Sequence, residues 1–133
     1  MHSAAARVGI NAQLLSGATT YRSAGVSGYI RQLLLHLPGE APDLFLTAFT
    51  PAGSVTDFPG IMLEHSRLQT ARPAQRILWE QAALPLAIRQ HNLDLLHGAV
   101  NVTPLLSLCP TVVTIHDLSF MRYPQAFPAP QRA

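Results

Sequence analysis

Residues 111–117 read Thr-Val-Val-Thr-Ile-His-Asp, an apolar run that ends in an imidazole and a carboxylate. Residues 111–115 are all β-branched, which favours extended backbone and predicts a buried strand. Placing His116 and Asp117 directly after such a strand costs free energy unless both side chains find polar partners. The stretch therefore predicts a core strand that delivers a titratable pair to the end of a sheet.

Four further apolar runs precede this strand and are also predicted to be strands. They cover residues 8–15, 44–50, 61–64 and 93–97. With two helical patterns between them, the order along the chain is β-α-β-β-α-β-β. This alternation is typical of a mostly parallel sheet with helices on both faces. The expected fold class is therefore α/β, with a Rossmann-like sheet.

The first helix is predicted to begin at about Val26, after a loop over residues 16–23, and to end at Pro38-Gly39. Helical spacing places its apolar residues on one face. They are Val26, Ile30, Leu33, Leu34 and Leu37.

The second helix is predicted over residues 73–90. Pro85 should kink it, because the carbonyl of Gln81 loses its usual donor. Trp79 is expected to pack and Glu80 to pair with Arg76. Its buried face would contain Ile77, Gln81, Leu84 and Ile88.

In an open parallel sheet, ligands bind outside the carboxyl ends of the strands. Three loops are expected to meet there: the Gly25-Val26-Ser27-Gly28 turn, the segment after His97-Gly98, and the pair His116-Asp117. Glycines at a helix start leave free N–H groups open to a ligand. The candidate binding residues are Gly25, Val26, Gly28, His97 and Asn101, and the candidate catalytic residues are His116 and Asp117.

The residues alone leave three interpretations of this edge open. His116 and Asp117 could orient a hydroxyl-bearing substrate. They could instead be structural, with Asp117 capping a turn and His116 bonded to a backbone carbonyl. A third interpretation makes His97, His116 and Asp117 metal ligands of a hydrolase, although the acidic residues are too few for a two-metal site.

Charge, cysteine content and missing motifs argue against several classes of function. The 133 residues carry a net charge of +2, and the Arg residues are scattered, which argues against a nucleic-acid partner. Cys109 is the only cysteine, so no disulfide can form within the chain. The glycines do not follow the G-x-G-x-x-G pattern and no acid ends the second strand, which disfavours NAD. Without a signal peptide or an apolar run of membrane-spanning length, the expected location is cytoplasmic.

Several runs in this order resemble family 4 (group 1) glycosyltransferases. The run Ser23-Ala24-Gly25-Val26-Ser27-Gly28-Tyr29-Ile30 is similar to their glycine loop and first helix. Further similar runs are Arg76-Ile77-Leu78-Trp79-Glu80-Gln81 with Leu84-Pro85, Asp94-Leu95-Leu96-His97-Gly98, residues 110–120, Arg122-Tyr123-Pro124 and Phe127-Pro128.

The resemblance implies the amino-terminal, acceptor-side domain of a GT-B enzyme of carbohydrate biosynthesis. Such enzymes transfer sugar from a nucleotide-sugar donor to an acceptor with retention of configuration, without a required metal or other cofactor. It implies that Gly25 and Gly28 lie near the donor phosphates and acceptor, and that His116 reaches the sugar. The implied partners are the nucleotide-sugar and a glycan or lipid-linked acceptor, with a peripheral membrane contact as a further candidate.

The paired glutamates of the family's carboxyl-terminal domain are missing, because Glu40, Glu64 and Glu80 do not have the family's spacing. Residues 1–133 are therefore expected to form a partial amino-terminal domain that is inactive alone, with another helix beginning at Pro130. The alternative is a non-catalytic α/β binding or assembly module. An unpaired sheet edge would favour self-association in either case.

Overall fold

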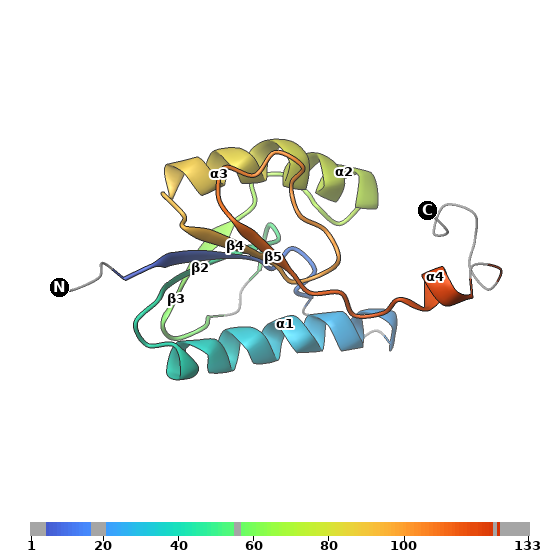
Figure 1. Ribbon diagram of the computed structural model, residues 1–133, viewed down its shortest axis with the longest axis horizontal. Coiled ribbons are helices and arrows are strands. Elements are labelled where there is room, and N and C mark those ends of the chain that lie inside the picture. The colour runs from blue at the N-terminus through green and yellow to red at the C-terminus, as the bar shows by residue number, and fades with distance from the viewer. Residues whose placement is uncertain (1–4, 17–20, 55–56, 124, 126–133) are drawn as a thin grey trace.

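A single parallel sheet organises the protein (Figure 1). The computed structural model describes residues 5–16, 21–54, 57–123 and 125. Within them the sheet has five strands in the order β3-β2-β1-β4-β5. The strands are β1 (Arg7–Asn11), β2 (Phe45–Thr50), β3 (Ile61–His65), β4 (Leu95–Gly98) and β5 (Thr111–Val113). All four strand pairings are parallel, which confirms the α/β class and a Rossmann-like order.

Helices cover both faces of the sheet, as expected (Figure 1). Helix α1 (Tyr21–Glu40) lies on one face, and the opposite face carries α2 (Pro73–Leu78), the π-helical turn η1 (Trp79–Ala83) and α3 (Leu84–Gln90). The short α4 (Ser119–Arg122) follows β5. None of the helices in the described part of the chain is long and apolar enough to cross a membrane.

Two apolar clusters hold the layers together. Ile30 and Leu34 of α1 pack with Ile10 of β1 in the first cluster. Trp79 and Leu84 pack with Leu96 of β4 in the second. Burying a large apolar side chain of this kind contributes about 1.5–3 kcal/mol to stability. The sheet is therefore fixed from both sides.

Helix α1 has the expected apolar face but different ends. It begins at Tyr21, earlier than Val26, and continues through Pro38 to Glu40. The apolar spacing locates only the buried face, and it says little about a polar first turn. Pro38 lies inside the last turn and lacks the N–H that would bond to the carbonyl of Leu34, so the end of the helix lacks that hydrogen bond. Residues 17–20 of the expected loop, Pro124, Phe127-Pro128 and the expected helix at Pro130 lie outside the described residues.

The interruption predicted from Pro85 is a π-helical turn immediately before it. The N–H of Leu84 bonds to the carbonyl of Trp79, so the turn holds one residue more than an α-helical turn. The extra residue rotates the side chains of α2 about the helix axis relative to those of α3. Ile77, expected on the buried face, is therefore 52% exposed, whereas Trp79 and Glu80 are buried.

The strand β5 is shorter and more exposed than predicted. It ends at Val113, and Val112 and Val113 are 51% and 41% exposed. The reason is its position at the end of the strand order, where β4 is its only partner among the described strands. A β-branched run specifies extended backbone, but it does not distinguish an edge from a centre. The expectation of burial was therefore wrong.

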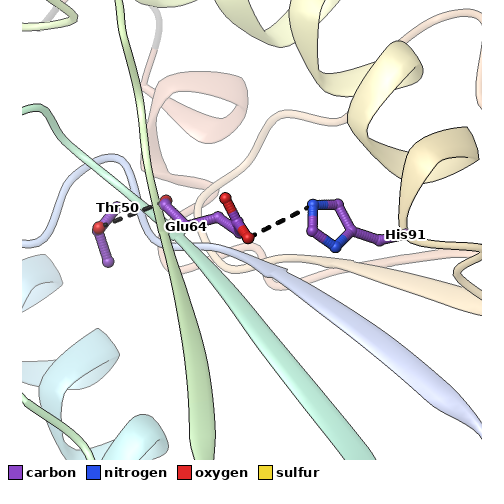
Figure 2. A network of polar contacts seen from close by, with 3 residues as sticks. All are labelled: Thr50, Glu64 and His91. Carbon is purple, nitrogen blue, oxygen red and sulfur yellow. Dashed lines mark hydrogen bonds and ion pairs between the residues drawn. The ribbon is translucent and has the colours of Figure 1, made fainter.

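Strand β3 at the other edge is linked to the end of α3. Figure 2 shows the Glu64 carboxylate facing the His91 ring, with Oε1 and Nε2 3.7 Å apart. The Thr50 hydroxyl reaches the backbone carbonyl of Glu64 at 3.5 Å. Both side chains of this pair contact solvent, and the contact is an ion pair only when His91 carries a proton, so it adds little to stability.

Candidate functional site

The carboxyl ends of all five strands lie at one edge of the sheet, because every pairing is parallel. The chain builds outward from β1 to β2 and β3, and then returns to place β4 on the other side of β1. Ligands of open α/β sheets bind where the strand order reverses in this way. The ends of β1 and β4 therefore mark the place to look for a site.

Thr114, directly after β5, connects two other elements at this edge. Its Oγ1 lies 2.8 Å from Nε2 of His97 in β4 and 3.1 Å from the hydroxyl of Tyr29 in α1. Both bonds are satisfied when Tyr29 donates to Thr114 and Thr114 donates to an unprotonated Nε2 of His97. Burial lowers the pKa of His97 from its ordinary value, which agrees with a neutral ring.

His116 is held from three directions. Its Nε2 lies 2.8 Å from the carbonyl oxygen of Ala99, and its backbone N–H donates to Oδ1 of Asn101 at 3.2 Å. The edge of one ring faces the other between Tyr29 and His116, with centroids 4.7 Å apart. The ring is thereby fixed while the residue stays exposed.

This arrangement defines the chemistry that His116 offers. Because a carbonyl oxygen only accepts, Nε2 of His116 carries a proton. In the neutral ring Nδ1 is then an acceptor, and no described residue donates to it. An exposed, oriented imidazole acceptor suits a ligand hydroxyl. The same bond to a backbone carbonyl is what the structural interpretation of His116 expected.

The structure brings together three of the predicted residues, namely His97, Asn101 and His116. Asn101 holds the segment that carries His116. It adopts a positive φ of 46°, its N–H donates to the carbonyl of Thr114 at 2.9 Å, and its side-chain oxygen accepts from the backbone N–H of His116. Asp117 is exposed next to His116. Val26 packs against the core under α1.

The glycine expectation needs a correction. Gly25 and Gly28 lie inside α1, beyond its first turn, so their N–H groups bond to carbonyls one turn earlier and are not free. A Cβ added at either position would meet no atom within 4 Å. Packing therefore does not require glycine there, and the two residues leave bare helix surface.

Sequence reasoning missed two residues of the site. Tyr29 and Thr114 were assigned only to a helix and a strand, yet their hydroxyls bond to each other and their neighbours include both histidines. In the sequence, Thr114 is only a hydroxyl-bearing residue at the end of a predicted strand, three residues before Asp117. That is a weak indication of a site residue. Its significance depends on strand order, which the sequence does not supply.

Gly98 is required by close packing. A Cβ there would lie 2.6 Å from the carbonyl oxygen of Val102 and 2.8 Å from Cγ2 of Thr103. The loop after β4 folds directly over this residue. Gly98 thus allows the approach that places Ala99 and Asn101 beside His116.

A buried carboxylate lies under the end of β1. Glu80 in η1 is 5% exposed; its Oε1 accepts from Nδ2 of Asn11 at 2.9 Å, and its Oε2 has no hydrogen-bond partner. Burial raises the pKa of Glu80, while the Asn11 bond and the charge of Arg76 act to lower it. The expected close pair with Arg76 is replaced by the bond to Asn11, because η1 turns Glu80 inward.

No cluster of three or more His, Cys, Asp or Glu side chains able to hold a metal ion occurs among the described residues. Nε2 of His97 is hydrogen-bonded to the hydroxyl of Thr114, and Nε2 of His116 is hydrogen-bonded to the carbonyl of Ala99.

The fold and site define an α/β protein with a Rossmann-like parallel sheet and a polar cluster at the carboxyl ends of β4 and β5. Comparisons with family models, with curated proteins and with solved structures return no match for the chain.

Proposed function

We propose that the chain is the amino-terminal, acceptor-side half of a retaining glycosyltransferase, which transfers a sugar from a nucleotide-sugar to a carbohydrate acceptor. The observation that supports this most is the joining of Tyr29, His97 and His116 at the edge where parallel sheets bind ligands. These residues come from segments that resemble the glycosyltransferase family in the same order.

In this proposal His116 is the residue that contacts sugar. Its Nδ1 accepts a hydroxyl, while the Ala99 carbonyl and Asn101 hold the ring and backbone in place. The exposed carboxylate of Asp117 accepts from a second hydroxyl. Gly25 and Gly28 contribute the bare surface of α1 to the donor side, without donating their N–H groups.

The rival function is a non-catalytic α/β binding or assembly module. It is favoured by the bond from His116 to a backbone carbonyl, since a purely structural histidine would make the same contact. The sequence encoded after Ala133 separates the two. The enzyme requires a second Rossmann-like half with paired glutamates there, and a stop codon would favour the module.

The enzyme proposal is tested with the chain joined to such a second half. Sugar transfer is measured with a panel of nucleotide-sugars for the unmodified protein and for His116→Ala. We expect a loss of about tenfold or more in kcat/KM, because a hydrogen bond to substrate is removed. His36→Ala is the matched control, since His36 is exposed on α1 and bonds only to Gln32 among the described residues.

Unchanged turnover in His116→Ala would remove His116 from the mechanism. The 133-residue chain alone is expected to transfer no sugar, because donor binding lies in the second half in this proposal. Sugar transfer by the purified chain would contradict the division of labour between the two halves.

A further inference from the structure

A second part of the same sheet edge is hollow. A cavity of about 800 Å³ opens at the ends of β1 and β2 and beside the segment that leads into α2. It shares no lining residue with the cluster around His116. Its polar lining includes Gln13, Ser16, Ser54, Asp57, Thr70 and Arg76. The volume lies within the range of about 300–1,000 Å³ usual for small-molecule sites.

The inner wall of this cavity is held rigidly by Gln13. The Gln13 side chain is buried, and its Nε2 donates to the carbonyl of Thr50 at 3.0 Å. The Thr70 hydroxyl donates to its Oε1 at 2.6 Å. Thr70 therefore keeps its oxygen lone pairs for a further donor, in a fixed direction. A wall whose rotamers are fixed before binding loses little entropy when a ligand arrives.

Arg76 supplies the charge of the cavity. Arg76 lines the cavity, and no described residue accepts a hydrogen bond from its guanidinium or forms an ion pair with it within 4 Å, although its charge acts at longer range on Glu80. The acid closest along the helix, Glu80, is turned inward to Asn11 by the π-helical turn. Five N–H donors in a planar fork are thus left for a ligand, and this geometry matches a phosphate or carboxylate group.

Asp57 restricts the ligand further. Asp57 lines the same cavity, and an ionised carboxylate there repels a second negative charge and accepts from hydroxyls. A polyanion would therefore be disfavoured. The cavity fits a small molecule that carries one anionic group and several hydroxyls.

We propose that this cavity binds a sugar-sized, hydroxyl-bearing molecule through a single phosphate or carboxylate held by Arg76. Thr70 and Ser54 face the hydroxyls, and Gln13 acts as a positioning residue for Thr70. The proposal does not depend on sugar transfer, because none of these residues belongs to the His116 cluster and binding needs no second domain.

The test is a nuclear magnetic resonance titration of the ¹⁵N-labelled chain. The probes are glucose 6-phosphate, glucuronate and uncharged glucose, which separate phosphate, carboxylate and hydroxyl recognition. We expect saturable shifts in the amide signals of Gln13, Ser54, Thr70 and Ala71 with a charged sugar, and none with glucose at the same concentration. If neither charged sugar shifts these signals, or if glucose shifts them equally, the proposal is wrong.

Substitutions then assign the charge. Arg76→Gln should weaken binding by about tenfold or more, because a charge-assisted pair is lost. Arg89→Gln is the matched control: it removes the same charge from the exposed last turn of α3 and should bind as the unmodified chain does. If Arg76→Gln does not fold, the affinity of Arg76→Lys is measured in its place. Lysine keeps the charge but loses the planar fork of donors, so this variant should also bind more weakly than the unmodified chain. Affinity unchanged in both Arg76 variants would overturn the assignment.

Discussion

The Nε2 proton of His116 is directed at the carbonyl oxygen of Ala99, 2.8 Å away. Ala99 follows β4, and His116 follows β5, so one hydrogen bond links the ends of two neighbouring strands. The bond also selects the tautomer of the ring, because a carbonyl cannot donate. The orientation of His116 therefore depends on the backbone that leaves β4.

Gly98→Ala should disturb that backbone. The new Cβ would lie 2.6 Å from the Val102 carbonyl oxygen, a backbone atom that cannot move aside as a flexible side chain can. We expect a loss of about 1–3 kcal/mol in the free energy of unfolding, measured by urea denaturation. The ring signals of His116 should shift in the same variant, since the bond to Ala99 is displaced.

The matched control is Gly28→Ala in α1, where an added Cβ meets no atom within 4 Å. Alanine is the better helix former by about 0.8–1 kcal/mol, so this variant should be more stable than the parent. Equal costs for the two substitutions would show that the loop after β4 is not packed tightly over Gly98.

His97 should make stability fall in weak acid. Burial lowers its pKa from 6.5, so the unfolded chain takes up a proton before the folded chain does. The stability that His97 contributes is therefore full above pH 6.5 and is lost as the pH falls toward the folded pKa. His97→Gln should show a smaller loss of stability across that window than the parent, because the group with the lowered pKa is removed. Parallel curves for parent and variant, measured by urea denaturation from pH 8 to pH 5, would rule it out.

Glu80 should act in the opposite direction. Burial raises its pKa above 4.5, so the folded chain holds a proton that the unfolded chain releases. Its contribution is complete below pH 4.5 and is lost as the pH rises through the folded pKa. Glu80→Gln keeps an acceptor for Asn11 without the charge, and it should be more stable than the parent by about 1 kcal/mol at pH 7. The difference should shrink toward pH 4; a difference that grows on acidification would contradict the sign.

The sequence was sufficient for the layers of the fold, because they follow from periodicity. The spacing of Ile30 and Leu34 identified the buried face of α1, and both side chains are fully buried. Element ends and the surroundings of β5 were not predictable in this way. Val112 and Val113 are β-branched and therefore favour extended backbone. Their exposure depends instead on which strands lie beside them, and the sequence does not show this.

The candidate site was predicted in part, for the same reason. His97 and His116 could be placed at strand ends because polar residues there interrupt apolar runs. The structure links both to Tyr29, His97 through Thr114 and His116 through the ring contact. The contribution of Tyr29 depends on how far α1 is turned toward β5, and that of Glu80 on a π-helical turn. Neither follows from apolar spacing.

The central claim is that α1, β4 and β5 build one site around His116. The most direct measurement is the nuclear Overhauser effect between the ring protons of Tyr29 and His116 in the chain in solution. With ring centroids 4.7 Å apart, strong cross-peaks between the two rings are expected. If the spectra are assigned, both rings are ordered and no such cross-peak appears, the claim that α1, β4 and β5 form one site around His116 is contradicted.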